Sequence, residues 1–135
     1  MDIAFILRDS KTIAIVGISD KPERPSYSVA SYLLEHGYRI IPVNPNLSEW
    51  RGIKAYPALS AIPSEIRESV DVVDIFRKSE DVLPIVEEAI KIKAKTVWMQ
   101  LGIKNEEAAG IARREGLNVI MDKCMKIEHM KLSHP

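Results

Sequence analysis

The sequence contains a single cysteine, Cys124, and no long apolar run. One thiol cannot form an internal disulfide, which excludes the class of secreted domains that disulfides hold together. The apolar run at residues 3–7 follows an acid and is far shorter than the ~18 residues that span a bilayer, and it does not resemble a signal peptide. We therefore expect a cytoplasmic protein with no membrane partner.

An excess of charge of one sign is also missing. The 19 basic and 19 acidic side chains cancel, whereas nucleic-acid-binding proteins usually carry a basic excess, so we expect no nucleic-acid partner. With 135 residues, 46% of them hydrophobic, the composition is typical of one globular domain, which we place over residues 1–135. This length leaves little room for a separate catalytic domain.

The sequence does show a regular alternation of apolar β-branched runs and amphipathic segments. We expect strands at 12–18, 38–43, 70–76, 96–101 and 117–121, and helices at 26–36, 79–93, 105–115 and in part of the tail from 123. The segment 53–66, which contains Pro57 and Pro63, should hold only one or two helical turns. This alternation predicts an α/β fold: a Rossmann-like, doubly wound, five-stranded parallel sheet with the strand order 3-2-1-4-5.

The loop after the first strand is the first candidate site, because ligands of such sheets bind at the carboxyl ends of the strands. It begins with Gly17 but lacks the further glycines of a dinucleotide-binding loop, since Ser19 stands at the second glycine position. Lys21, Arg24 and the hydroxyl of Ser26 could instead contact phosphates directly. The alternative is a solvated turn in which the two acids of the loop cancel the two cations.

The loop after the second strand bears on which nucleotide could bind. An NAD site normally places an acidic residue there to accept hydrogen bonds from the ribose hydroxyls. Residues 42–45 read Pro-Val-Asn-Pro and the next acid is Glu49, which counts against NAD. Arg51 and Lys54 lie just beyond and could serve a terminal phosphate, or could simply be solvated.

The remaining strand ends offer weaker candidates. Phe76 and Arg77 follow the third strand, where a ring and a cation could hold an adenine, unless Phe76 belongs to the core. Gln100 ends the fourth strand and either faces the ligand or is a structural amide. Cys124 follows the fifth strand near two lysines, whose charges would favour a reactive thiolate if they lie close to the sulfur; a buried, inert thiol is the alternative.

Neither a catalytic set nor a metal site is apparent in the sequence. The histidines at positions 36, 129 and 134 have no metal-ligand spacing with Cys124, and the acids lie mainly on expected helix surfaces. We therefore expect no catalytic residues and no bound metal.

The strand ends taken together resemble a known family. The chain is similar to the small stand-alone CoA-binding proteins, whose fold is that of the CoA-binding domain of the succinyl-CoA synthetase alpha subunit. The matching stretches occur in order along nearly the whole chain: AIVGISDKPERPSY at 14–27, HGYRIIPVNP at 36–45, VVDIFR at 72–77, AKTVWMQLG at 94–102 and VIMDKC at 119–124.

The resemblance implies a site for coenzyme A. Gly17, Ile18 and Ser19 would wrap the diphosphate, with Lys21 and Arg24 as cationic clamps. The other implied contacts are Pro42, Val43, Asn44 and Pro45 beside the nucleotide, Phe76 and Arg77 at the adenine, Gln100, Leu101 and Gly102 along the pantetheine arm, and Cys124 near its thiol end.

Two departures from the synthetase limit what the resemblance implies. Its phosphorylated histidine belongs to a second domain that this chain lacks, so ligase activity is not implied. The lysine and glycine run that follows its Asn-Pro turn is replaced here by Asn-Leu-Ser-Glu-Trp at 46–50, so the sequence leaves open which residues hold the 3′-phosphate.

We conclude from the sequence that the protein is a non-enzymatic binder of CoA or an acyl-CoA, in which Cys124 could form a mixed disulfide with the CoA thiol. One alternative is an NAD(H)-dependent enzyme or redox sensor on the same fold, against which the missing acid after the second strand argues. Another is a subunit that supplies CoA to a larger ligase. The partner would then be a ligase chain, and a homo-oligomer is the other arrangement we consider.

Overall fold

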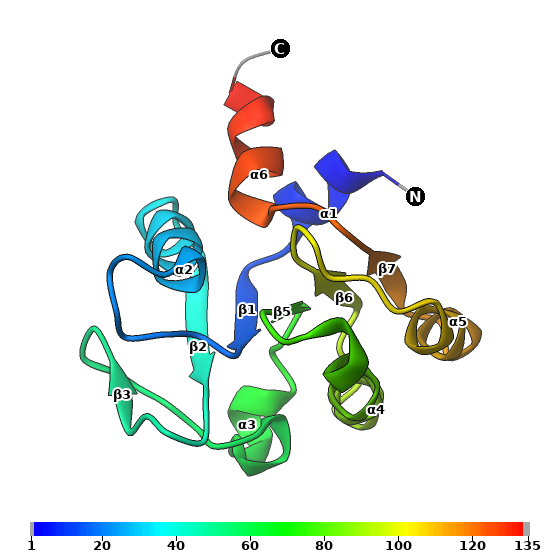
Figure 1. Ribbon diagram of the computed structural model, residues 1–135, viewed down its shortest axis with the longest axis horizontal. Helices are drawn as coiled ribbons and strands as arrows, with labels where there is room; N and C mark the ends of the chain where they lie inside the picture. The colour runs from blue at the N-terminus through cyan, green and yellow to red at the C-terminus, as the bar shows by residue number, and fades with distance from the viewer. Residues whose placement is uncertain (1, 134–135) are drawn as a thin grey trace.

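The computed structural model describes residues 2–133 and shows a parallel sheet between two layers of helices (Figure 1). The sheet consists of β1 (Thr12–Val16), β2 (Arg39–Val43), β5 (Val72–Ile75), β6 (Thr96–Met99) and β7 (Asn118–Ile120). A separate antiparallel hairpin of β3 (Glu49–Trp50) and β4 (Ile53–Lys54) follows β2. The α/β fold with a five-stranded parallel sheet is confirmed.

The helices form two layers because side chains alternate between the two faces of each buried strand. In β1, Ile13 and Ile15 pack on one face, whereas Ala14 and Val16 pack on the other. The first face is covered by α1 (Ile3–Asp9), α2 (Pro25–Glu35) and α6 (Met125–Ser133). The second is covered by the 3₁₀ turn η1 (Leu59–Ala61), α3 (Ser64–Arg67), α4 (Val82–Lys91) and α5 (Glu106–Arg114).

The strand order differs from the expected one. The sheet runs β2-β1-β5-β6-β7, which in order of its five parallel strands is 2-1-3-4-5. The expected order 3-2-1-4-5 is therefore wrong, because the third strand pairs with the first instead of the second. The topological switch point then lies between β1 and β5.

Pro42 gives the physical reason why β2 is an edge strand. Proline has no N–H to donate to a sheet ladder, so an edge position suits it and a central position does not. On the outer side of β2, the Pro42 carbonyl accepts a hydrogen bond from the Tyr56 N–H at 3.0 Å. The Tyr56 carbonyl also accepts from the Asn44 N–H at 2.9 Å, and within residues 2–133 this isolated bridge, with no full strand, covers the edge.

Several helix boundaries follow their expected causes. Pro84 delays the helix after β5, so that a 3₁₀ turn η2 (Ser79–Asp81) comes first and α4 begins at Val82. Asn105 caps α5, because its side chain accepts a hydrogen bond from the Ala108 N–H. Gly37, with φ of 94°, follows the end of α2.

Two elements have no counterpart in the sequence-based prediction: the helix α1, capped by Asp2, and the hairpin β3–β4. The hairpin strands are two residues long, which is too short to give a periodic signal. Within residues 2–133, no helix is both long and apolar enough to cross a membrane.

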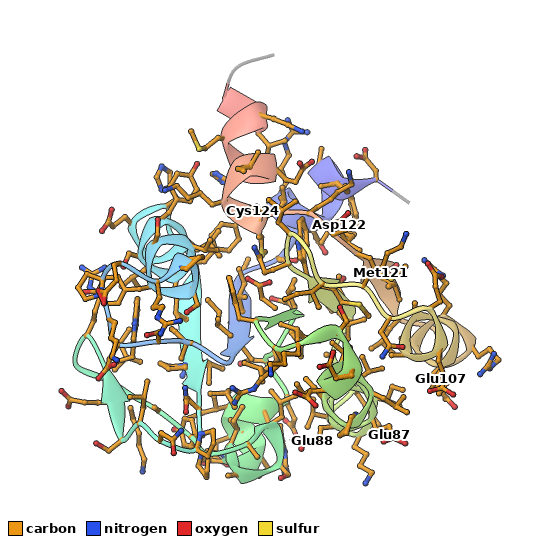
Figure 2. All side chains as sticks on the ribbon, viewed as in Figure 1. Glu87, Glu88, Glu107, Met121, Asp122 and Cys124 are labelled. Carbon is orange, nitrogen blue, oxygen red and sulfur yellow. The ribbon has the colours of Figure 1, made fainter. Side chains whose placement is uncertain are left out.

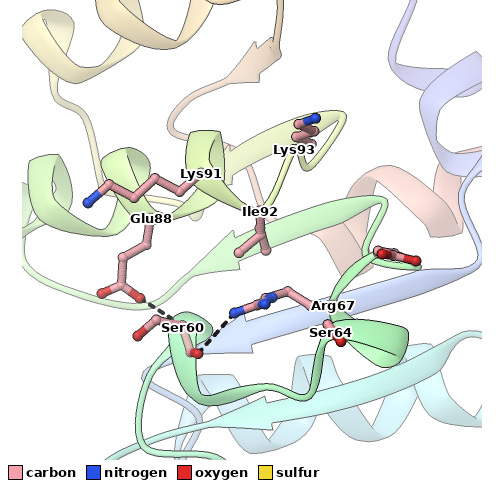
Figure 3. A pocket seen from close by; sticks show the side chains of 8 residues that line it. Ser60, Ser64, Arg67, Glu88, Lys91, Ile92 and Lys93 are labelled. Carbon is pink, nitrogen blue, oxygen red and sulfur yellow. Dashed lines mark hydrogen bonds between the residues drawn. The ribbon is translucent and has the colours of Figure 1, made fainter.

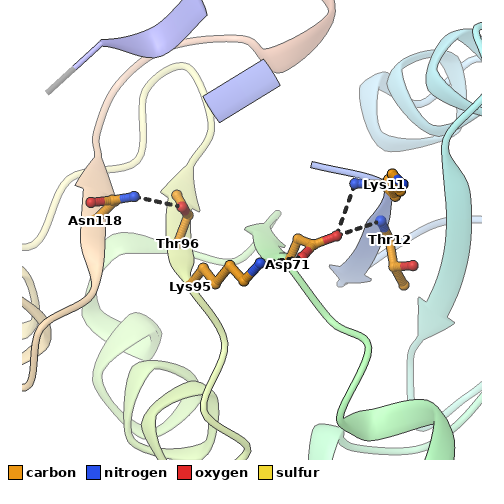
Figure 4. A network of polar contacts seen from close by, with 6 residues as sticks. All are labelled: Lys11, Thr12, Asp71, Lys95, Thr96 and Asn118. Carbon is orange, nitrogen blue, oxygen red and sulfur yellow. Dashed lines mark hydrogen bonds and ion pairs between the residues drawn. The ribbon is translucent and has the colours of Figure 1, made fainter. Parts of the chain in front are cut away.

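Asp71 joins three strands at the amino edge of the sheet (Figure 4). Its carboxylate accepts hydrogen bonds from the N–H groups of Lys11 and Thr12, at 2.8 and 3.0 Å, and lies 3.4 Å from the Lys95 ammonium. Burial by itself raises the pKa of the Asp71 carboxyl, but these donors outweigh it and hold the pKa below its ordinary value. Asp71 is thus a structural anion on the side of the sheet opposite to the strand carboxyl ends.

Candidate functional site

A hollow of about 380 Å³ lies at the switch point between β1 and β5. This is the position at which doubly wound sheets bind their ligands. The lining residues come from the loops after the two strands, from the start of α2 and from the loop after β6: Gly17, Ser19, Lys21, Arg24, Pro25, Ser26, Phe76, Arg77, Lys78 and Ile103.

Gly17 is required where the two strand ends approach each other. Its φ is 89°, and a Cβ at this position would overlap the Phe76 carbonyl oxygen. The close approach is fixed on both sides, since the Gly17 N–H donates to Val43 O and the Phe76 N–H donates to Val16 O. Any larger residue would push the loop away from β5.

The loop that follows Gly17 is held in place by side chains from distant segments. The Asn44 amide donates to Ile18 O at 2.7 Å, and the Trp50 indole N–H donates to Ser19 O at 3.0 Å. The Ser19 N–H in turn donates to Ser26 Oγ at 2.9 Å. The Ile18 and Ser19 carbonyls are thus bonded to side chains that do not line the hollow, a preorganised arrangement that suits an anionic ligand.

The N-terminus of α2 opens into the same hollow. The helix begins at Pro25, and its N-cap residue Arg24 makes no side-chain capping hydrogen bond. Ser26, expected as a hydroxyl donor, is buried and accepts from the Ser19 N–H, so it braces the loop while it lines the hollow. A helix N-terminus with lining cations favours anions.

Four cations line the hollow: Lys21, Arg24, Arg77 and Lys78. Within residues 2–133, none of them has a carboxylate within 4.0 Å. Asp20 of the same loop lines a different hollow, next to the hairpin. The acids and cations of this loop cancel in the charge sum, but Lys21 and Arg24 form no ion pairs with the neighbouring acids. The hollow itself is therefore cationic.

A smaller hollow of about 150 Å³ adjoins the first one, and Arg77 lines both. Its walls are mainly apolar: Val16, Val43, Pro45, Pro57, Ala58, Leu59 and Ile85, with Arg77 and Glu88. Of the expected residues 42–45, Val43 and Pro45 face this slot. Pro42 is buried in β2, and Asn44 holds the Ile18 carbonyl.

The cations of the β3–β4 hairpin are engaged elsewhere. The Arg51 guanidinium lies 3.4 Å from the Glu35 carboxylate and 5.6 Å from the Trp50 ring centre. The Lys54 ammonium lies over the Tyr56 ring. The hairpin contributes to this site through Trp50, whose indole N–H holds the Ser19 carbonyl. The sequence-based prediction did not include Trp50.

Gln100, Leu101, Gly102 and Cys124 form a second group, at the carboxyl ends of β6 and β7, and none of them lines the two hollows. Gln100 is buried and its Oε1 accepts from the Met125 N–H at 3.2 Å, which fits the structural-amide alternative. The Gly102 N–H donates to the Asp122 carboxylate at 2.7 Å. Leu101 is 65% exposed beside them.

Cys124 lies at the start of α6 (Figure 2), where its carbonyl accepts from the Glu128 N–H. Its side chain is half-buried and packs against the core under α2 and α6. Of the two flanking lysines, Lys126 reaches Ser28 Oγ at 3.1 Å on α2. Lys126 therefore contacts α2, whereas the Cys124 side chain packs on the apolar cluster of this face of the sheet.

Asp74 is a residue that the sequence-based prediction missed. It is fully buried in β5 between Ile15 and Trp98, and within residues 2–133 neither carboxyl oxygen has a hydrogen-bond partner. Burial raises the pKa of the Asp74 carboxyl well above its ordinary value, because the apolar surroundings disfavour the charged form. An acid inside an otherwise apolar strand was the available signal.

The titratable residues elsewhere form no further site. Within residues 2–133, no group of three or more His, Cys, Asp or Glu side chains is arranged to hold a metal. His36 and His129 meet at the contact between α2 and α6, whereas His134 lies outside the described residues. A hollow of about 390 Å³ between α3 and α4 is lined by charges, but Arg67 and Glu88 there bond to the Ser60 backbone (Figure 3).

The fold and the site define a class: a Rossmann-like domain with a cation-lined hollow at its switch point. The model of one family, the CoA-binding domain, matches residues 11–130. The chain belongs to this family, which confirms the resemblance seen in the sequence.

Relatives of two kinds support the assignment. Uncharacterized protein YneT of Bacillus subtilis (strain 168) is 42% identical over 128 residues, which cover 95% of this chain and 92% of that protein. The structure of a hypothetical protein from Pyrococcus horikoshii OT3 matches with a TM-score of 0.91 at 45% identity, over 98% of this chain and 90% of that one.

The other kind is larger. The alpha subunit of ADP-forming acetate–CoA ligase II from Pyrococcus furiosus is 27% identical over 125 residues, which cover 85% of this chain and 27% of the subunit. This chain thus spans about a quarter of the length of that ligase subunit.

Proposed function

We propose that the protein binds coenzyme A or an acyl-CoA at the carboxyl ends of β1 and β5. The observation that carries the proposal is the hollow with four cations and no paired carboxylate, in a chain of the CoA-binding family. CoA carries a ribose 3′-phosphate in addition to its diphosphate, whereas NAD carries the diphosphate alone. A site with this many unpaired cations suits the more highly charged ligand.

The proposed ligand runs across the edge of the sheet. Its diphosphate lies on the loop after Gly17 and at the N-terminus of α2, beside the charged side chains of Lys21 and Arg24. The N–H groups of Gly17 and Ser19 are already bonded within the protein, so the side-chain cations supply the main contacts. Its adenine enters the apolar slot beside Val43 and Pro45. Its pantetheine arm extends towards residues 100–102 and the start of α6.

Calorimetric titration with CoA, NAD and NADP in parallel tests the proposal. We expect binding of CoA and little or none of NAD. Tight binding of NAD without binding of CoA would overturn the proposal and favour the NAD(H)-dependent alternative. Asn44 supports CoA over NAD, because it stands at the position of the ribose-binding acid and its amide is bonded to Ile18 O.

The cationic clamps supply a second test. Lys21→Ala and Arg24→Ala each remove a charge-assisted contact to phosphate, so each should weaken CoA binding by ~1–3 kcal/mol. Lys54→Ala, which removes a cation that lies over the Tyr56 ring, is the matched control and should leave the affinity unchanged. Unchanged affinity in both clamp variants would move the phosphate site elsewhere.

We propose further that the chain has no ligase activity of its own. It corresponds to about a quarter of a ligase alpha subunit, so a complete ligase would need parts that match the rest. A ligase partner that receives CoA from this chain, or a second copy of the chain, are the two assemblies we consider. Co-purification of a partner chain from the source cells would favour the first, and a homodimer as the sole species the second.

Cys124 could react with the thiol end of the ligand. In the proposed exchange, the Cys124 thiolate attacks CoA disulfide, a Cys–S–S–CoA bond forms, and CoA thiolate leaves. Mass spectrometry under non-reducing conditions, after incubation with CoA disulfide, should show an adduct of the mass of CoA that is absent in Cys124→Ser. Absence of any adduct, or its persistence in Cys124→Ser, would contradict this step.

The cytoplasmic location expected from the sequence also stays a prediction.

A further inference from the structure

Arg77 occupies a position that no other cation of the site shares. It follows β5 directly and is half-buried, and it lines both the cationic hollow and the apolar slot. The preceding residue is fixed by the bond from the Phe76 N–H to Val16 O, at 2.8 Å. Arg77 therefore projects from a rigid strand end at the junction of the two hollows.

The charges around the junction leave Arg77 unopposed. The slot contains one acid, Glu88, whose carboxylate accepts from the Ser60 N–H at 3.3 Å. Glu88 lies more than 4.0 Å from the Arg77 guanidinium, and Arg77 has no ion pair within residues 2–133. Its fork of donors is available for an anion that reaches the junction.

Of the four cations that line the hollow, Arg77 is the one that also lines the slot, whereas Lys78 lines the hollow alone. Lys21 and Arg24 belong to the loop at the N-terminus of α2 and do not line the slot. Residues 46–50, which follow Pro45 at the other wall of the slot, carry no cation. Arg51, the next one along the chain, is paired with Glu35.

We propose that Arg77 binds the ribose 3′-phosphate and so makes the site selective for CoA over dephospho-CoA. The inference rests on the proposed function: with the diphosphate at the α2 N-terminus and the adenine in the slot, the ribose joins them at Arg77. A bidentate guanidinium contact to a phosphate is strong and directional, which suits it to discriminate a ligand that has this group from one that lacks it.

Calorimetric titration of CoA and of dephospho-CoA into the wild type, Arg77→Ala and Lys21→Ala tests the inference. The wild type should prefer CoA by about 10- to 100-fold, as expected for one charge-assisted contact. Arg77→Ala should bring the ratio of the two affinities close to one, mainly through weaker CoA binding. Lys21→Ala should weaken both ligands alike and preserve the ratio. A thermal melt of each variant checks that it is folded, and Arg77→Lys should restore part of the preference.

The outcomes separate the inference from the function on which it rests. If the wild type binds CoA and dephospho-CoA equally, or if Arg77→Ala keeps the wild-type ratio, the role of Arg77 is wrong while CoA binding stands. If the wild type binds neither, both the proposed function and the inference fail. If NADP binds as tightly as CoA, the site does not distinguish a ribose 2′-phosphate from a 3′-phosphate, and the selectivity proposed for the 3′ position is overturned.

Discussion

At the scale of single residues, Asp74 places a carboxyl group in the apolar interior of the protein. Asp74 is fully buried in the central strand, and neither of its oxygens is hydrogen-bonded to residues 2–133. An unsatisfied buried polar group costs free energy, and in this case the cost depends on pH because burial raises the pKa of the Asp74 carboxyl.

The pKa of Asp74 predicts a pH dependence of stability. Because the folded-state pKa is raised, the stabilising contribution is fully present below the unfolded pKa of about 3.9 and is lost as the pH rises towards the folded pKa. Asp74→Asn stays neutral at every pH, so it should be more stable than the wild type at pH 8 and lose this advantage near pH 4. Urea unfolding at several pH values measures the difference. A constant difference between the two proteins across this range would contradict the prediction.

At the scale of elements, the hairpin β3–β4 holds the loop that follows Gly17 in place. The Trp50 indole donates to Ser19 O across 31 positions of sequence, and the Tyr27 ring of α2 packs edge-on against Trp50. Trp50 thereby connects α2 to the loop, through its ring contact with Tyr27 and its hydrogen bond to Ser19 O. Preorganisation of this kind lowers the entropic cost of ligand binding.

Trp50→Phe removes the indole donor and keeps an aromatic ring in the core. We expect CoA affinity to fall by at most about 1 kcal/mol, since the lost hydrogen bond limits how much the ordering of the loop can cost on binding. Calorimetry measures the change. Tyr27→Phe keeps the ring contact and is the matched control, for which the affinity should be unchanged. Equal effects of the two substitutions would show that the indole hydrogen bond does not brace the loop.

The contact between α2 and α6 is a second feature at this scale. The Tyr32 hydroxyl and His129 Nδ1 are 2.8 Å apart, the His36 and His129 rings are 5.4 Å apart, and Lys126 lies over the Tyr32 ring. Burial first, and the charge of His36 second, lower the pKa of His129 below its ordinary value. Protonation of His129 thus disfavours this contact.

The lowered pKa sets the sign of a second pH dependence. The contribution of His129 is present above the unfolded pKa of about 6.5 and is lost as the pH falls through the folded value. Amide hydrogen exchange in α6 should therefore speed up between pH 7 and about 5, after correction for the intrinsic pH dependence of exchange. His129→Phe keeps an aromatic ring that cannot titrate, and its corrected exchange should be flat. The same acceleration in His129→Phe would refute the assignment.

At the scale of the whole molecule, the Asp71 network and the cation-lined hollow lie at opposite edges of the sheet. We call the Asp71 network the anchor. Asp71 joins the starts of β1, β5 and β6 through Lys11, Thr12 and Lys95. The cation-lined hollow lies at the opposite, carboxyl ends of β1 and β5. The anchor can therefore be altered without a direct effect on the site.

Asp71→Asn tests this separation. The substitution removes the negative charge that one carboxylate oxygen presents to both backbone N–H groups and the other to the Lys95 ammonium. The two charge-assisted hydrogen bonds become neutral ones, so the free energy of unfolding at pH 7 should fall by about 1.5–3 kcal/mol. CoA affinity should be unchanged. Lys95→Met removes only the exposed ion pair and should cost less than about 1 kcal/mol. Denaturant unfolding and calorimetry report the two effects separately, and a large loss of CoA affinity in folded Asp71→Asn would contradict the separation.

How much was predictable from the sequence differs between the sheet and its surroundings. The strands and α5 were predicted because apolar runs and the Asn105 cap act locally. The strand order was wrong because the partner of β5 depends on how residues 44–71 cross the sheet. Pro42 held part of the answer, since a residue without an N–H suits the edge.

The candidate site shows the same division. The sequence identified Gly17, Lys21 and Arg24, because a glycine and cations after an apolar strand form a local pattern. It did not identify Trp50 or Asp74, whose importance comes from partners, or the lack of them, that are distant in sequence. It also could not separate the two alternatives for Gln100, which the bond to Met125 N–H distinguishes.

The sequence by itself determined the fold class, the family and the cations after the strands, because periodicity and motif are properties of neighbouring residues. Only the tertiary structure decided which strand ends meet. It placed β5 beside β1, so that Arg77 joins Lys21 and Arg24 at one hollow. It also left these cations without paired acids, which the balanced charge of the chain had concealed. Charge composition is a sum over residues, whereas a binding site depends on where the charges lie in space.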